Sequence, residues 1–316
     1  MAADQALTKS KKPKRKWNKR RKKEALWGIF FVAPFIIGFV FFLLGPMLLS
    51  LYGSFTNYNL TSRMDFIGLD NFRRMFTMDE LFWTSLYNTA YYVIFNVPLT
   101  TIGSILLAVL LNRRIRGIGV FRTIFYLPAV LSGVAVYVLW MQLLSPSTGL
   151  VNTLLGFIGI DGPAWLFDPN WTKPALILMR LWSVGGSMLL YLATLQNVPK
   201  QLYESAEMDG ANKFQQFLHI TLPMITPIIF YDIVTSTIGS FQIFQEAYVM
   251  TESGTAGPAN SLLFYNFHMW NKAFVAFDMG YAMAMSMVLF LVVLALTFIN
   301  LKVAPRWVHY GGGKNL

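Results

Sequence analysis

Polar or small residues recur at intervals of three or four within one apolar stretch of the chain. They are Asp232, Thr235, Ser236, Gly239, Gln242 and Glu246. On an α-helix this spacing predicts a single shared face. Polar groups inside a membrane are costly, so they usually face a bundle interior or a water-filled cavity. With Tyr231 beside it, this face could hydrogen-bond sugar hydroxyls and pack on sugar rings. Polar contact between helices is the alternative role.

The preceding apolar stretch holds a second group of candidates. Arg180 could pair with Asp232, could meet a negative group of a substrate, or could extend to the membrane interface. Trp182 could be an aromatic platform or a packing residue. The neighbouring Gly185 and Gly186 are predicted to allow close contact between helices. Two further polar candidates lie earlier in the chain, at Asn88 and Asn96.

Composition indicates a membrane protein. The chain of 316 residues is 55% hydrophobic and 13% charged, whereas soluble domains carry about 25% charged residues. This composition argues against a water-soluble enzyme and against a disordered chain. The absence of cysteine excludes disulfides, thiolate metal sites and cysteine nucleophiles. The three histidines lie too far apart in the sequence for a metal-binding spacing.

Six apolar segments are long enough to cross a bilayer as helices, which takes about 20 residues. Their predicted limits are Leu26–Tyr52, Asn88–Leu111, Gly117–Leu144, Pro174–Leu195, Pro223–Gln245 and Gly280–Leu301. Prolines within them do not exclude helices, because neighbouring helices can satisfy the freed backbone groups. The predicted fold is therefore an all-α integral membrane protein with six transmembrane helices.

Basic residues predict the orientation of these segments. Eleven of the 26 Lys and Arg lie in the first 24 residues, directly before the first apolar segment. Loops that would share a side with this tail also carry most of the remaining Lys and Arg. Because cytoplasmic loops are enriched in basic residues, both termini are predicted to be cytoplasmic. The tail could also touch anionic lipid, whereas nucleic-acid binding would need basic residues on a folded surface.

The loop between the fourth and fifth segments, residues 196–222, has a helical pattern of its own. Apolar residues after Pro199 predict a short amphipathic helix. Gly210 then permits a turn, and a second short helix leads to Pro223. Three acidic residues cluster at the bend, namely Glu204, Glu207 and Asp209. Acids suit a protein partner with Lys or Arg, although a plain connector on the inner leaflet is the alternative.

This loop resembles the cytoplasmic signature of permeases from binding-protein-dependent ABC importers. That signature is Glu-Ala-Ala, three residues, Gly, nine residues and Ile-x-Leu-Pro. The matching residues here are Glu204-Ser205-Ala206, Gly210, Ile220, Leu222 and Pro223, with Ser205 as the one departure. The segment Phe121–Pro128, and Trp182 with Gly186 before Leu195–Pro199, resemble the sugar-importer (MalF-like) branch. The resemblance covers roughly residues 26–305.

The resemblance implies an ABC importer type I permease fold. A six-span permease domain at 26–305 would lie between cytoplasmic tails at 1–25 and 306–316. It also implies that the loop is a coupling helix docked on an ATP-hydrolysing subunit. The implied coupling residues are Glu204, Ser205, Ala206, Asp209 and Gly210. The implied partners in a bacterial inner membrane are a second homologous permease, two ATP-binding subunits, an extracytoplasmic solute-binding protein and membrane lipid.

The chain itself carries no phosphate-binding loop of the Gly-x4-Gly-Lys-Ser/Thr type. We therefore expect no catalytic residue, metal site or cofactor in this chain, with ATP and Mg²⁺ bound by partner subunits. The expected function is that of a permease subunit of an ATP-driven importer for a sugar or oligosaccharide, including polysaccharide fragments. The expected substrate-pathway residues are Arg180, Trp182, Tyr231, Asp232, Ser236, Gln242 and Glu246.

Three alternatives stay open at this point. A glycerol-phosphodiester importer is possible because related permeases carry such substrates. A secondary transporter working alone would need internal repeats with broken helices, and no clear repeat is evident between the halves of the sequence. A membrane assembly or sensor subunit would leave the pattern from Glu204 to Pro223 without explanation.

Overall fold

The computed structural model describes residues 19–61, 63–113, 116–131, 133–251 and 254–309. These residues are mostly helical, with one isolated β-bridge between Thr56 and Phe66 and no strand. The predicted all-α class is therefore confirmed. The chain divides into two compact units, one ending at Tyr52 and the other beginning at Gly53. Most of the predicted basic tail and the last seven residues, at 1–18 and 310–316, lie outside the described residues.

The described part of the first unit, from Lys19 onward, is a continuous helix with a wider turn in its middle. α1 (Lys19–Gly38) continues through the π-helical η1 (Phe39–Leu44) into α2 (Gly45–Gly53). Pro46 has no N–H for a bond to the preceding turn, and the wider π-helical turn lies just before it. The stretch Leu26–Gly53 is long and apolar enough to cross a membrane.

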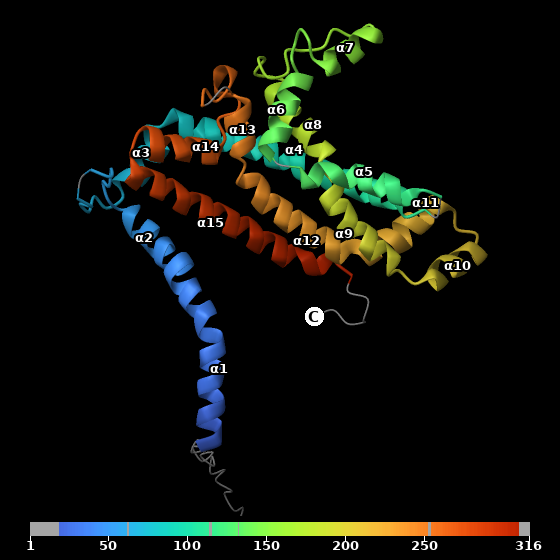
Figure 1. Cartoon of the computed structure of the whole chain (residues 1–316), viewed down its shortest axis with the longest axis horizontal. Coiled ribbons are helices and arrows are strands. Elements are labelled where there is room, and N and C mark those ends of the chain that lie inside the picture. The colour runs from blue at the N-terminus through green and yellow to red at the C-terminus, as the bar shows by residue number, and fades with distance from the viewer. Residues whose placement is uncertain (1–18, 62, 114–115, 132, 252–253, 310–316) are drawn as a thin grey trace, which may run out of the picture. The chain divides into compact units, whose positions relative to one another are not determined.

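Three long helices form the framework of the second unit (Figure 1). They are α4 (Glu80–Leu111), α12 (Leu222–Phe241) and α15 (Met279–Val303). α12 packs against both α4 and α15. All three belong to stretches long and apolar enough to cross a membrane. Pro98 lies inside α4 and Pro227 inside α12 without ending either helix, as predicted.

Two further candidate spans are bent pairs of helices. α8 (Thr172–Trp182) and α9 (Gly185–Gln196) meet at an angle of 44°. α5 (Ile118–Val130) is followed by Leu131, whose backbone is extended, and α6 (Gly133–Leu143) follows at 101°. The described residues thus give four spans, or six if each bent pair is one span. The break between α5 and α6 was not predicted, because the apolar pattern runs through it without interruption.

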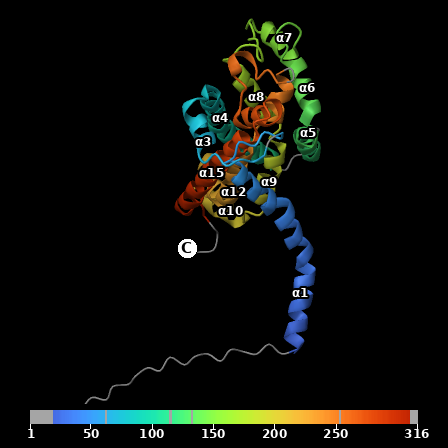
Figure 2. The same cartoon turned by 90° about the vertical axis from the view of Figure 1, so that its left-hand side faces the viewer.

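The remaining helices of the second unit are short. They are α3 (Asp70–Thr77), α7 (Leu150–Phe157), α10 (Lys200–Met208), α11 (Lys213–Gln216), η2 (Phe217–Thr221), α13 (Gln245–Met250), η3 (Pro258–Asn260), α14 (Tyr265–Trp270), η4 (Asn271–Val275) and η5 (Ala304–Arg306). Two perpendicular views show α6 and α7 extending away from α12 and α15 (Figures 1 and 2).

α9 packs against α4, α5 and α12 in the interior of the second unit. Met188 and Tyr191 of α9 are fully buried there, as is Ile225 of α12. A Cβ on Gly185 would lie 2.1 Å from the carbonyl oxygen of Phe125, so only glycine permits this approach of α9 to α5. The predicted close helix contact is therefore confirmed at Gly185.

A polar cluster joins the start of α4 to two later segments of the second unit. The carboxylate of Asp79 caps α4 by accepting a hydrogen bond from the backbone N–H of Phe82. Its Oδ2 atom also contacts Nε2 of His268 at 2.9 Å, the hydroxyl of Tyr281 at 2.7 Å and Nζ of Lys272 at 3.1 Å. Asp79 thus connects α4 with α14, η4 and α15.

Candidate functional site

A cavity of about 280 Å³ lies where α4, α12 and the α8–α9 pair meet. Hydroxyl, amide and charged side chains dominate its wall. The lining residues are Asn96, Thr100, Ser104, Arg180, Ser183, Val184, Ser187, Leu190, Tyr231, Asp232, Thr235, Ser236, Gly239 and Ser240. Four of the predicted pathway residues therefore share one cavity, at positions 180, 231, 232 and 236.

The carboxylate of Asp232 lies at the centre of a hydroxyl cluster. Ser187 and Ser236 donate to Oδ1 at 2.8 and 3.5 Å. Thr101 and Tyr191 donate to Oδ2 at 3.1 and 2.8 Å. A carboxylate offers about four acceptor positions, so these hydroxyls occupy all of them. Since the donors come from α4, α9 and α12, Asp232 joins three helices.

Sequence reasoning missed three of these four donors. Thr101 lies beside Thr100 in α4, and Ser187 and Tyr191 share α9 with Thr194. Ser, Thr and Tyr are common in such helices, so only the distance of each hydroxyl from Asp232 in the folded chain reveals its role. Asn96 was named as a polar candidate and does line the cavity. Asn88, by contrast, donates to the carbonyls of residues 260 and 263, outside the cavity.

Arg180 lies in the last turn of α8, immediately before the bend, and is exposed in the cavity wall. It forms no ion pair with Asp232, so that one of the three suggested roles is wrong for the described structure. Irregular backbone at membrane depth is tolerated where it is buried in protein or lines a cavity, which fits the bend at Ser183–Val184.

The other predicted pathway residues lie outside this cavity. Trp182 packs edge-on against Trp140, with ring centroids 6.0 Å apart. α12 ends at Phe241, so Gln242 terminates the helix and Glu246 belongs to α13. The predicted continuous face of the fifth segment is wrong beyond Gly239, because residues 242–244 leave the helical conformation.

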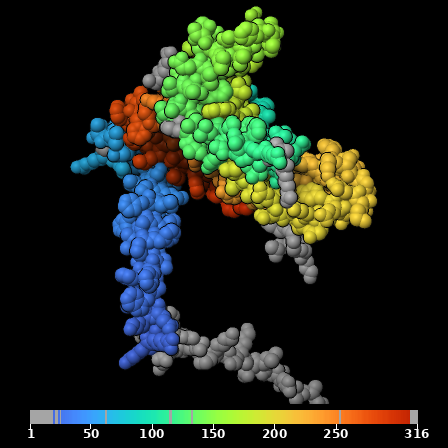
Figure 3. Space-filling model, turned by 45° about the vertical axis from the view of Figure 1, so that its right-hand side comes forward, coloured from blue at the N-terminus to red at the C-terminus, as the bar shows by residue number. Residues whose placement is uncertain are grey.

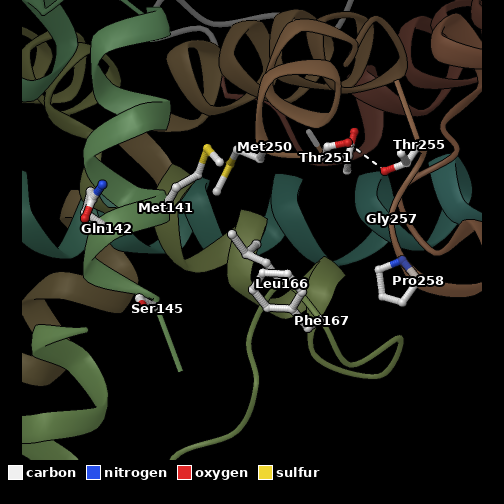
Figure 4. A pocket seen from close by; sticks show the side chains of 10 residues that line it. All are labelled: Met141, Gln142, Ser145, Leu166, Phe167, Met250, Thr251, Thr255, Gly257 and Pro258. Carbon is white, nitrogen blue, oxygen red and sulfur yellow. Dashed lines mark hydrogen bonds between the residues drawn. The ribbon is translucent and has the colours of Figure 1, made fainter. Parts of the chain in front are cut away.

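A second cavity, of about 510 Å³, is lined mainly by apolar groups (Figure 4). Met141 and Met250 point toward each other in its wall, and Leu166 and Phe167 also line it. Thr255 donates a 2.6 Å hydrogen bond to the backbone carbonyl of Thr251 at its edge. None of the predicted pathway residues lines this cavity.

The segment 199–221 forms the predicted pair of short helices around a turn. α10 ends at Met208, and Gly210 has φ +79°, which is the left-handed conformation that favours glycine. The N–H of Ala211 bonds the carbonyl of Ala206 at 2.9 Å. Asn212 and Gln215 then form a reciprocal capping box that starts α11. We call residues 199–221 the helical turn.

The acidic residues of the helical turn have different surroundings. Glu204 and Asp209 are exposed, and Met208 between them is 89% exposed. Glu207 instead forms an ion pair with Lys213, whose ammonium group lowers the pKa of the Glu207 carboxyl below its ordinary value. Figure 3 shows this yellow segment as a lobe at one end of the second unit. The hydroxyls of Tyr203 and Thr221, 2.9 Å apart, link α10 to η2.

Comparison with protein families identifies one match over most of the second unit. Residues 82–309 match the family described as "binding-protein-dependent transport system inner membrane component". This range contains both the polar cavity and the helical turn. It also contains the residues that carry the cytoplasmic signature.

Individual relatives cover nearly the whole chain. The chain is 43% identical to the probable ABC transporter permease YesP of Bacillus subtilis, over 92% of this chain and 94% of YesP. It is 39% identical to the lactose transport system permease LacF of Rhizobium radiobacter, over 88% and 93% of the two chains. Among solved structures, a chain of a bacterial transporter that imports the acidic polysaccharide alginate matches with a TM-score of 0.80. The two chains share 27% identity over 91% of this chain and 98% of that one.

Proposed function

Because this chain belongs to the family of binding-protein-dependent inner membrane components, we propose that it is the permease subunit of an ATP-driven sugar importer. The family and the apolar helices place the chain in a membrane. Its substrate would be a sugar or oligosaccharide. The helical turn at 199–221 is the observation that carries the proposal. It would be the surface on which a separate ATP-hydrolysing subunit docks.

The geometry of the helical turn suits a mechanical contact. Two short helices with a left-handed glycine between them form a defined lobe rather than a loose loop. Glu204, Asp209 and Met208 project from it into solvent. Carboxylates and a flexible thioether are groups that bind Arg, Lys and apolar surfaces of a partner. The proposed coupling residues are thus Glu204, Ser205, Ala206, Asp209 and Gly210.

The polar cavity supports a carbohydrate as substrate. Its wall offers hydroxyl, amide and guanidinium groups that can bind sugar hydroxyls, and Tyr231 adds an aromatic ring. Relatives of this chain include a lactose permease and arabinooligosaccharide permeases. The proposed pathway therefore passes Arg180, Asp232 and Tyr231, with Ser236 beside them.

The proposed complex contains a second homologous permease, two ATP-binding subunits that hold ATP and Mg²⁺, and a solute-binding protein. A related alginate transporter has been solved with a periplasmic protein that carries an alginate pentasaccharide. Both termini and the helical turn would face the cytoplasm. Closure of the ATP-binding subunits would push the helical turn, and the helices around Asp232 would move with it.

Reconstitution tests this proposal. The chain is co-expressed with its candidate partners, purified, and placed in liposomes containing ATP. We expect sugar uptake that requires the ATP-binding subunits and the solute-binding protein. Uptake by the chain alone, driven by an ion gradient, would contradict the proposal. Uptake of glycerol phosphodiesters but of no sugar would support the alternative substrate class.

A further inference from the structure

We propose that Arg180 makes this importer selective for sugars that carry a carboxylate, as uronic acids do. The inference rests on the proposed function, because it assigns a substrate class to the polar cavity. Two groups of that cavity, the guanidinium of Arg180 and the Oδ1 atom of Asn96, have no hydrogen-bond partner among the described residues.

Arg180 is a cation without a partner among the described residues. Its guanidinium has five N–H donors, yet it forms no hydrogen bond, ion pair or ring contact with another described side chain. It lies eight residues after the start of α8 at Thr172, which is about 12 Å along the helix axis at 1.5 Å per residue. At that depth a charged group normally faces a cavity and a partner group.

The nearby acids do not satisfy these donors. Asp232 lines the same cavity, but four hydroxyl groups already occupy its oxygens. Glu246 lies beside Tyr137 and forms no ion pair with Arg180. Neither carboxylate fills the hydrogen-bonding fork of the Arg180 guanidinium. An acceptor for that fork must therefore come from outside the described chain.

Asn96 in the cavity wall indicates that the ligand also carries hydroxyl groups. Asn96 is 3% exposed and donates to the hydroxyl of Ser240 at 3.0 Å. Its Oδ1 atom, also buried, has no hydrogen-bond partner within the described chain. A buried acceptor without a donor is costly. A turn of the Asn96 amide toward the cavity would let a sugar hydroxyl supply that donor.

A carboxylate matches the free fork of Arg180 better than a neutral group does. Planar guanidinium and carboxylate groups form two parallel charge-assisted hydrogen bonds, which are about twice as strong as neutral ones. A sugar with a carboxylate on one edge and hydroxyls on the other would thus satisfy both Arg180 and Asn96. The cavity is small for a ligand site, which favours the binding of one acidic unit of a sugar chain at a time.

The test compares acidic and neutral sugars that are otherwise matched. Uptake into liposomes by the complete complex is measured for trimers of galacturonate and galactose, glucuronate and glucose, and mannuronate and mannose. The same solute-binding protein is used at saturation throughout, so its own preference cancels when variants are compared. A thermal shift of the complex without that protein gives a second readout for each trimer.

The variants are Arg180→Gln, Arg180→Lys and the exposed surface control Arg73→Gln. We expect Arg180→Gln to lower uptake of the preferred acidic trimer about tenfold or more, and to change its neutral counterpart less than about twofold. Arg180→Lys should retain part of the preference, because the charge remains but the fork is lost. Arg73→Gln should leave both substrates unchanged.

Several results would overturn the inference. They are equal losses for acidic and neutral trimers, no loss in Arg180→Gln, and a failure of both Arg180 variants to assemble, which would assign Arg180 to a subunit contact. Wild-type transport of neutral trimers alone would overturn this inference and leave the proposed function intact. Transport of no sugar at all would overturn the proposed function itself.

Discussion

The phenolic hydroxyl of Tyr191 on α9 donates a 2.8 Å hydrogen bond to the carboxylate of Asp232 on α12. Tyr191 is fully buried and Asp232 is 4% exposed. The bond therefore joins the second half of a bent span to a straight one at the wall of the polar cavity. Asp232 holds the helices around the proposed pathway together, whatever it contributes to the substrate.

Removal of this hydroxyl should weaken the helix contact. In Tyr191→Phe, Oδ2 of Asp232 keeps Thr101 as its remaining donor. Hydrogen bonds to charged groups contribute about 1.5–3 kcal/mol, so we expect the free energy of unfolding to fall by about that amount. Thermal unfolding of the purified complex measures it. Tyr231→Phe is the matched control, because that hydroxyl is exposed and forms no hydrogen bond with another described residue.

A double-mutant cycle separates the bond from general damage. If Tyr191 stabilises the protein through Asp232, then Tyr191→Phe should cost much less in the Asp232→Asn background than in the wild type. Additive losses would mean that the Tyr191–Asp232 bond contributes nothing to stability.

The neighbouring glycines at the start of α9 offer a prediction with a built-in control. A Cβ at Gly185 would lie 2.1 Å from the carbonyl oxygen of Phe125, a backbone atom that cannot move alone. At Gly186 the nearest atom would be the Cβ of Ala129, at 3.9 Å. We expect Gly185→Ala to lower stability by about 1–3 kcal/mol and Gly186→Ala to have little effect. Equal thermal midpoints for the two variants would show that α9 can move away from α5 without cost.

The sequence predicted some of the polar residues of the cavity wall, such as Asp232 and Ser236, but not the hydrogen bonds that satisfy them. Asp232 and Ser236 stood out because polar residues at helical spacing are conspicuous in an apolar stretch. The hydroxyls of Ser187 and Tyr191 did not stand out, since their convergence on Asp232 depends on how three helices pack. Nor did the spacing reveal the end of α12 at Phe241, because the same interval continues into residues 242 and 246.

The helical turn was easier to predict than the cavity. Its conformation depends on local features: a proline before α10, a glycine at the turn and a capping box at α11. Such features act over a few residues and can be read directly from the chain. The ion pair between Glu207 and Lys213 could not be predicted in this way, because it depends on how the turn at Gly210 places the start of α11 relative to the end of α10.

Gly210 should be sensitive to backbone strain rather than to crowding. No atom lies within 4 Å of a Cβ built there, but its φ of +79° disfavours β-branched residues strongly and asparagine much less. Under the proposed function, we expect Gly210→Val to uncouple ATP hydrolysis from uptake, and Gly210→Asn to preserve most of both activities. ATPase and uptake rates of the reconstituted complex measure the ratio. Normal coupling in Gly210→Val would argue against the assigned role of the turn.

Acid should destabilise the cluster of polar side chains around Asp79. Burial lowers the pKa of His268, although the carboxylate of Asp79 acts in the opposite direction. Burial acts to raise the pKa of Asp79. Hydrogen bonds from Tyr281, His268 and Lys272 outweigh it and hold that pKa well below its ordinary range. At neutral pH, then, a neutral His268 donates its Nε2–H to an ionised Asp79.

The sign of the pH dependence follows from these two directions. An unfolded chain takes up the His268 proton near its ordinary pKa of about 6.5, above the pKa in the fold, so stability from His268 is lost as pH falls below that value. Asp79 adds a second loss below its ordinary pKa of about 4. We expect the free energy of unfolding to fall between pH 7.5 and pH 5.5, by up to about 1.4 kcal/mol per pH unit for one proton. The thermal midpoint of the complex should fall with it. His268→Asn, which keeps a donor for Asp79, should flatten this slope, whereas His309→Asn at an exposed site should not. The variant His268→Asn removes only the ionisation of His268 from the cluster. If the pH dependence of stability were unchanged in this variant, His268 would not be its cause.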